Sequence, residues 1–208
     1  MPRPTATLAI AAVTVAVSLA ISFFRLEDWA SIFAGFIPAR ASGTLDIYDA
    51  LPVWITPLSA TLVHGGLLHL GFNTLMLVYA GSQTEKAVGA GGIVVLYLVG
   101  AFAAAGAQWA AGPLEQVRMI GASGAISALM GGYSLLYGRN SRARAIGPIS
   151  ATAVHVIWLA AAWTGINLLI GLLSRGAGMP IAAAAHIGGF IAGLALARPL
   201  LMMRWRGA

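Results

Sequence analysis

Long stretches without charged side chains dominate this sequence and limit the folds open to it. Residues 5–24 carry no charge, and a helix of that length spans about 30 Å, the thickness of a membrane's hydrocarbon layer. A signal peptide has a shorter apolar core of roughly 7–15 residues, so we interpret this segment as a retained first span. Charged residues make up only 9% of the chain, against about 25% in soluble domains. The sequence therefore predicts a polytopic membrane protein.

Six apolar segments are expected to form transmembrane helices. They are residues 5–24, 66–84, 88–110, 121–137, 151–173 and 181–203. The loop at 25–65 mixes aromatic side chains with acids, a composition typical of a segment at the lipid–water interface. No repeat, low-complexity tract or appended soluble domain is visible, so we interpret residues 1–208 as one all-α domain.

Basic residues are distributed unevenly between the two sides of this topology. The side with both termini, the turn at 85–87 and the loop at 138–150 has eight Lys and Arg residues and one acid, Glu85. The opposite side has four Arg residues and five acids. By the positive-inside rule both termini are predicted to be cytoplasmic. Membrane topology thus accounts for the net charge of +6, and no nucleic-acid partner is expected.

Ser123 is the candidate nucleophile, in the sequence Gly121-Ala122-Ser123-Gly124. The flanking glycines allow tight backbone geometry and a close approach of another chain. The residue is expected at a helix start, where free N–H groups favour an anion. A serine hydroxyl is nevertheless a weak nucleophile without an adjacent base, and small residues of this kind also pack helices in membranes.

His186 is the candidate base, because ionisable residues within a membrane are costly and tend to be functional. It follows a run of alanines and precedes Gly189 and Gly193, so its helix can approach a partner rich in small residues. Apolar surroundings favour a neutral ring that can accept the serine proton. A buried histidine bonded to a carbonyl is the competing interpretation.

His69 and Asn73 are four residues apart and are expected to share one helix face. Two donors on one face can stabilise a tetrahedral oxyanion with help from the backbone N–H of Ser123, although they can also join helices by hydrogen bonds. His64 lies off this face and is assigned to ordering the start of the segment. The second, fourth and sixth spans run in the same direction, so the three motifs are expected at similar depth near the external face.

Metal binding is disfavoured by the spacing of the histidines. They do not form the i, i+4 pair of a helical zinc site, and the chain has no cysteine. We expect no metal and no cofactor. With no carboxylate at the same depth, Ser123 and His186 are predicted to act as a dyad.

In order, the motifs His64-x4-His69-x3-Asn73, Gly121-x-Ser123-Gly124 and Ala185-His186-x2-Gly189-x3-Gly193 resemble those of the rhomboid intramembrane serine proteases. The resemblance extends over roughly residues 60–195, and Glu85, four residues after Gly81, is similar to a further family signature. It implies a six-span fold with Ser123 as nucleophile and His186 as general base. His69, Asn73 and the Ser123 amide would form the oxyanion hole.

The resemblance also implies that span five and the loop at 174–182 form a substrate gate and cap. Two departures stand out: the first loop lacks a Trp-Arg pair that many relatives carry, and Ser127 replaces an aromatic residue that often packs on the catalytic histidine. The serine and histidine themselves are both present, whereas the family's pseudoproteases lack one of them.

We therefore predict a minimal bacterial-type protease of the inner (plasma) membrane, which cuts transmembrane protein substrates within the lipid bilayer. Two alternatives remain: a catalytically silent binder or chaperone of membrane proteins, and a small-solute transporter. A transporter should show paired repeats or broken helices, and neither is evident. The sequence does not fix the oligomeric state.

Overall fold

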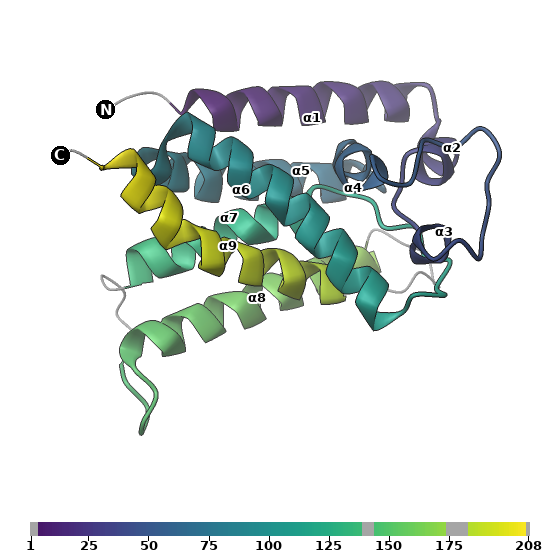
Figure 1. Ribbon diagram of the computed structural model, residues 1–208. Coiled ribbons are helices and arrows are strands. Elements are labelled where there is room, and N and C mark those ends of the chain that lie inside the picture. The colour runs from purple at the N-terminus through teal and green to yellow at the C-terminus, as the bar shows by residue number, and fades with distance from the viewer. Residues whose placement is uncertain (1–3, 139–143, 174–182, 207–208) are drawn as a thin grey trace.

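The computed structural model describes residues 4–138, 144–173 and 183–206, and all regular secondary structure in this part of the chain is helical (Figure 1). The elements, in order, are α1 (Thr5–Phe23), α2 (Glu27–Phe33), α3 (Pro38–Ala41), α4 (Thr56–Ser59), η1 (Ala60–Leu62), α5 (Leu67–Met76), the π-helical turn η2 (Leu77–Gly81), α6 (Ser82–Ala111), α7 (Ser123–Tyr137), α8 (Ala151–Leu173) and α9 (Ala183–Arg204).

Four helical runs in the described residues are long and apolar enough to cross a membrane. They are Thr5–Phe23, Leu67–Ala111, Ala151–Leu169 and Ala183–Arg204. The second run is 45 residues long, about twice what one crossing requires. It also changes direction within α6 (Figure 1), at Gly89, whose φ of 82° is rarely adopted by residues with a side chain.

Residues 85–87 were expected to form a turn, but they lie within helix α6. There the side chain of Glu85 makes hydrogen bonds inside the protein. Glu85 is buried, and its carboxylate accepts hydrogen bonds from Ala6 N (3.1 Å), Thr7 N (2.8 Å) and Thr7 Oγ1 (2.6 Å). These amides belong to the first turn of α1, where they have no partner within the helix and a negative charge is favoured. The carboxylate therefore fixes α1 to α6, and the bend is displaced to Gly89.

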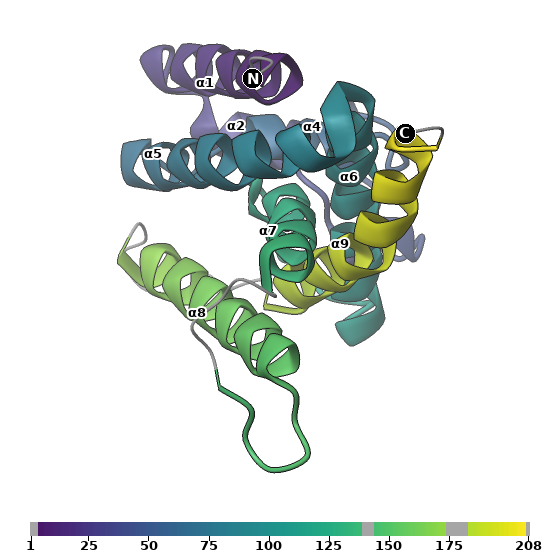
Figure 2. The ribbon, with the colours of Figure 1, turned by 90° about the vertical axis from the view of Figure 1, so that its left-hand side faces the viewer.

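α7 lies at the centre of the bundle, with α6 and α9 packed against it (Figure 2). Every residue from Ser123 to Gly132 is buried. A Cβ atom on Gly189 would overlap the carbonyl oxygen of Gly124, and one on Gly193 would overlap that of Ala128. A Cβ on Gly124 would lie 2.6 Å from Cβ of Ala104. Small residues thus let the backbones approach closely, as membrane helix pairs require.

The segment at 25–65 is folded onto the rest of the protein. Phe36 and Met119 form an isolated antiparallel bridge, with N–O distances of 3.1 and 2.8 Å. Phe36 and Ile37 are buried there, whereas Trp29 and Trp54 are 56% and 69% exposed. One side of the segment therefore covers the bundle, and the other presents aromatic rings outward, as an interfacial segment would.

Candidate active site

Ser123 and His186 meet at the junction of α7 and α9. Ser123 is the first residue of α7, and His186 lies in the first turn of α9. His186 Nε2 is 2.9 Å from Ser123 Oγ, and both side chains are buried. The glycine at 189, one turn along α9, allows this approach. A neutral imidazole with its proton on Nδ1 can accept the serine proton at Nε2.

The other ring nitrogen of His186 has no partner among the described residues. Nδ1 is buried and unbonded, and no described carboxylate interacts with it. A carboxylate in that position would orient the ring and stabilise its protonated form, as in a triad. Within the part of the chain that the structure describes, Ser123 and His186 therefore form a pair, and no third residue completes a triad.

His69 lies beside the turn that leads into Ser123. Its Nδ1 accepts a hydrogen bond from Gly65 N at 3.4 Å, so in a neutral ring Nε2 carries the proton. Gly121 has a φ of 103°, and a Cβ atom at this position would be only 2.7 Å from His69 Nε2. Glycine at 121 thus allows the positive φ of the backbone, and its lack of a side chain leaves room for the His69 ring.

Asn73 lies one helical turn after His69 on α5 and is fully buried. Its Nδ2 donates a hydrogen bond to the carbonyl oxygen of His69 at 2.9 Å, and its Oδ1 has no partner among the described residues. An amide nitrogen carries two hydrogens, so one of them remains for another acceptor. His69 and Asn73 share one face of the helix, as their spacing predicts.

His64 connects α1 to the turn before Ser123. Ser18 Oγ donates to the carbonyl of Leu62 at 2.8 Å, so its 2.9 Å contact with His64 Nδ1 requires the proton on that nitrogen. His64 Nε2 then accepts the N–H of Ala122 at 3.4 Å. Burial, together with the neighbouring His69, lowers the pKa of His64 from 6.5 to about 3. A neutral His64 therefore holds the backbone next to the serine.

Ser127 makes two hydrogen bonds, and the one to a distant helix is not predicted by its place in the sequence. Its hydroxyl donates to the carbonyl oxygen of Ser123 at 2.7 Å and accepts from Trp163 Nε1 at 2.7 Å. Trp163, on α8, also stacks on Phe72 of α5 with ring centroids 5.8 Å apart. In the sequence, Ser127 stands out as a serine at a position where relatives often carry an aromatic residue. No local pattern marks a contact between residues 36 positions apart.

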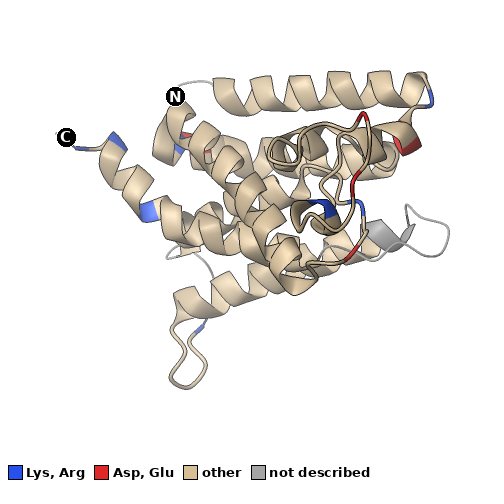
Figure 3. Ribbon diagram, turned by 45° about the vertical axis from the view of Figure 1, so that its right-hand side comes forward, with Lys and Arg blue, Asp and Glu red and all other residues tan. Residues whose placement is uncertain are grey.

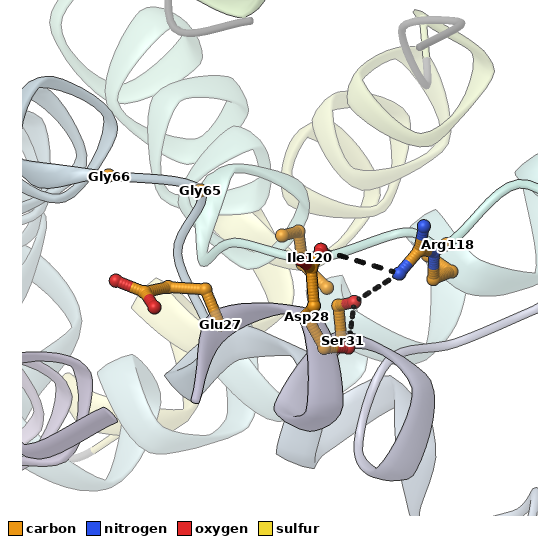
Figure 4. A pocket seen from close by; sticks show the side chains of 7 residues that line it. All are labelled: Glu27, Asp28, Ser31, Gly65, Gly66, Arg118 and Ile120. Carbon is orange, nitrogen blue, oxygen red and sulfur yellow. Dashed lines mark hydrogen bonds and ion pairs between the residues drawn. The ribbon is translucent and has the colours of Figure 1, made fainter. Parts of the chain in front are cut away.

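A charged cavity lies beside the turn that precedes Ser123, on the side of α2 (Figure 4). Its volume is about 290 Å³, and it is lined by Glu27, Asp28, Ser31, Gly65, Gly66, Arg118 and Ile120. Arg118 NH1 bonds to Ser31 Oγ at 2.8 Å and lies 3.8 Å from Asp28. Gly65 and Ile120 link this polar space to the residues around His69 and Ser123.

These groups together supply what acyl transfer requires. A hydroxyl contacts a nitrogen base, a second imidazole lies against the turn that leads into the hydroxyl, and an amide lies one helical turn after that imidazole. Donors preorganised in a site shielded from water stabilise a developing oxyanion far better than water does. The arrangement is therefore suited to a serine nucleophile attacking a carbonyl group.

The sequence is also similar to a family model and to several known proteins. A family model described as Rhomboid domain matches residues 52–203. The Rhomboid protease GlpG of Pectobacterium atrosepticum is 32% identical over 192 residues, which cover 92% of this chain and 61% of that protein. Proteins of the same name from Yersinia enterocolitica and Serratia proteamaculans are each 35% identical over 140 residues, 67% of this chain and 45% of theirs. The chain thus spans less than two thirds of the length of these relatives.

Proposed function

This chain belongs to the rhomboid family, and on that premise we propose that it is an intramembrane serine endopeptidase. The observation that carries the proposal is the 2.9 Å contact between Ser123 Oγ and His186 Nε2. In the proposed reaction, His186 takes the proton as Ser123 attacks the substrate carbonyl, and then returns it to the leaving amine. Water hydrolyses the resulting acyl-enzyme with His186 again acting as base.

His69, Asn73 and the backbone N–H of Ser123 are proposed to bind the oxyanion. The Nε2 proton assigned to His69 and its position against Gly121 support this role. So does the second amide hydrogen of Asn73, which its bond to the His69 carbonyl leaves available. His64, Gly121 and Gly124 support the turn, and Gly189 and Gly193 support the approach of α9. Glu85 fixes the start of α1 to α6.

Six crossings with both termini in the cytoplasm form the proposed topology. The 45-residue run supplies two crossings by turning at Gly89, and the central α7 supplies another beside the three remaining runs. The charges support the orientation: acidic side chains gather on the 25–65 segment, which includes α2, whereas basic side chains lie near the C-terminus at the other end of the helices (Figure 3). The positive-inside rule then places the latter end in the cytoplasm of a bacterial inner membrane.

The proposed substrates are transmembrane segments of other membrane proteins. A helix hides its own carbonyl groups, so the substrate must unwind near the cut, and small or helix-weakening residues are expected there. The water needed for hydrolysis can approach through the charged cavity beside Gly65 and Ile120. We propose α8 as the gate through which substrate arrives; the suggested cap at 174–182 lies outside the described residues.

The test is cleavage of a single-span substrate by the purified protein in detergent. Ser123→Ala and His186→Ala should each abolish cleavage. Ser134→Ala is the matched control. This serine is also buried on α7, but among the described residues it bonds only to its own helix, through Gly131 O at 2.8 Å, so the variant should leave cleavage intact. Cleavage that persists in Ser123→Ala would refute the mechanism, and an intact substrate with the unaltered protein would favour a silent binder.

A further inference from the structure

The turn before Ser123 is held in part by a side chain. Gly121 N donates to the backbone carbonyl oxygen of Ala60 at 2.9 Å. The next amide along the chain, Ala122 N, donates instead to His64 Nε2 at 3.4 Å. A carbonyl oxygen is always an acceptor, whereas an imidazole nitrogen accepts only while it carries no proton. The hydrogen bond at Ala122 therefore depends on where the proton of the His64 ring lies.

Ser18, near the end of α1, determines which nitrogen of His64 carries that proton. The hydroxyl proton of Ser18 is donated to the carbonyl oxygen of Leu62 at 2.8 Å, because a carbonyl can only accept. The 2.9 Å contact between Ser18 Oγ and His64 Nδ1 then needs a proton on Nδ1. This leaves Nε2 as an acceptor, which is the state that Ala122 N requires. Hydrogen bonds at both nitrogens of the ring thus require the same tautomer.

The other tautomer of His64 would break this series of hydrogen bonds. Burial and the neighbouring His69 lower the pKa of His64 from 6.5 to about 3, so the ring is neutral at neutral pH and only its tautomer can vary. With the proton on Nε2, that N–H would face the N–H of Ala122 at 3.4 Å. Nδ1 would then need a donor, and Ser18 could serve it only by giving up the Leu62 carbonyl.

His64 lies next to two of the groups proposed to bind the oxyanion. Its ring packs edge to face against His69, with centroids 5.0 Å apart. Its bond to Ala122 N holds one side of Ala122, and the carbonyl on the other side accepts Ile126 N at 2.9 Å. That carbonyl shares a peptide plane with the N–H of Ser123. Because Ser123 is the first residue of α7, its N–H has no acceptor within the helix, and its direction follows from how Ala122 is held.

We propose that Ser18 is a positioning residue, which holds His64 in the tautomer that binds Ala122 N and thereby aligns the Ser123 N–H for the oxyanion. This inference rests on the proposed protease function and extends the site's support to α1. Ser18 is only 2% exposed, and its hydroxyl reaches Leu62 of η1, an element against which α1 packs. Consecutive hydrogen bonds of one direction polarise and strengthen one another, so one hydroxyl on α1 acts on an amide next to the nucleophile.

Kinetics of Ser18→Ala give the first test. This variant removes the acceptor of His64 Nδ1 and leaves the ring free to adopt either tautomer. A hydrogen bond of ordinary net strength corresponds to roughly fivefold in an equilibrium, so kcat for a transmembrane substrate should fall about fivefold. KM should not change, because an oxyanion donor acts in the transition state. Ser134→Ala, which loses only a bond within α7, should keep full activity. An unchanged kcat in Ser18→Ala, or a raised KM alone, would overturn the proposal.

A double variant tests whether Ser18 acts through His64. His64→Ala should lower kcat at least as much as Ser18→Ala, because it removes the acceptor of Ala122 N itself. The double variant should then match His64→Ala, since the two changes interrupt the same series of bonds. Two effects that multiply would mean that Ser18 acts on the site by a separate route, which would contradict the proposed role.

Nitrogen NMR reads the tautomer without any proteolysis. The chain has four histidines, and after isotope labelling of the imidazoles the His64 signals are those that disappear in His64→Gln. Nδ1 should be protonated and Nε2 unprotonated in the unaltered protein and in Ser134→Ala, whereas Ser18→Ala should show a mixture of the two tautomers. The same single tautomer in Ser18→Ala would overturn the proposal. Because this measurement needs no catalysis, failure of the positioning role and failure of the protease assignment are distinguishable.

Discussion

Replacing Gly189 with alanine should inactivate the site without touching a reacting group. The added Cβ would overlap the carbonyl oxygen of Gly124 and lie 3.0 Å from Cβ of Ser127. The main obstacle is backbone, which cannot turn aside as a flexible side chain can, so α9 must move away from α7. Overpacking of this kind typically costs about 1–3 kcal/mol of stability.

The effect on catalysis follows from the position of His186 one turn before Gly189. A displacement of about 1 Å in a catalytic group can cost on the order of 100-fold in rate, and it would stretch the 2.9 Å contact with Ser123 beyond hydrogen-bonding range. We therefore expect kcat to fall roughly 100-fold in a detergent cleavage assay. The thermal midpoint, measured in parallel, should fall modestly while the protein remains folded.

Gly106→Ala is the matched control for this experiment. Gly106 lies in the interior of α6, and a Cβ atom there would have no neighbour within 4 Å. Alanine favours a helix over glycine by about 1 kcal/mol, so this variant should be at least as stable as the unaltered protein and equally active. Full activity in Gly189→Ala would refute the argument that backbone contact between α7 and α9 sets the dyad geometry.

Three further substitutions test other parts of the account. Asn73→Ala should lower kcat by roughly 100-fold or more with little change in KM, because an oxyanion donor acts in the transition state; initial-rate kinetics with a raised KM alone would contradict this. Glu85→Gln should reduce stability by about 2 kcal/mol, since hydrogen bonds to a charged acceptor are lost at the start of α1; an unchanged denaturation midpoint would contradict it. The unfolded chain protonates His64 near pH 6.5 and the folded protein only near 3, so stability should fall as pH drops through this window. His64→Gln should remove up to about 1.4 kcal/mol per pH unit of that slope, and parallel pH curves for both proteins would count against the assignment.

Helix positions were largely predictable from this sequence because the signals are local. The absence of charge from residues 5–24 and the spacing of His69 and Asn73 each depend on a short stretch of chain. The contact between Ser123 and His186, 63 positions apart, was predictable for a different reason. The sequence predicts that the three motifs begin spans of one direction and therefore lie at similar depth, and this expectation leaves little freedom in how they meet.

The features that escaped prediction depend on contacts between distant segments. Glu85 was expected in a turn, but the amide groups of α1 attract its carboxylate into the protein, and the bend falls at Gly89. The short helices within 25–65 form because that segment packs on the bundle and on Met119. Ser127 stands out in the sequence for the aromatic ring it lacks, whereas its bond to Trp163 joins residues 36 positions apart on different helices.

The most direct test of the central claim is whether Ser123 is activated by His186. A fluorophosphonate reacts with an activated serine, forming a bond from Oγ to phosphorus with release of fluoride, and peptide mass spectrometry then locates the adduct. The account predicts a single adduct on Ser123 in the unaltered protein and its loss in His186→Ala, with Ser134→Ala labelled normally. An adduct that forms equally well without His186, or one found on another residue while Ser123 stays unmodified, would contradict it.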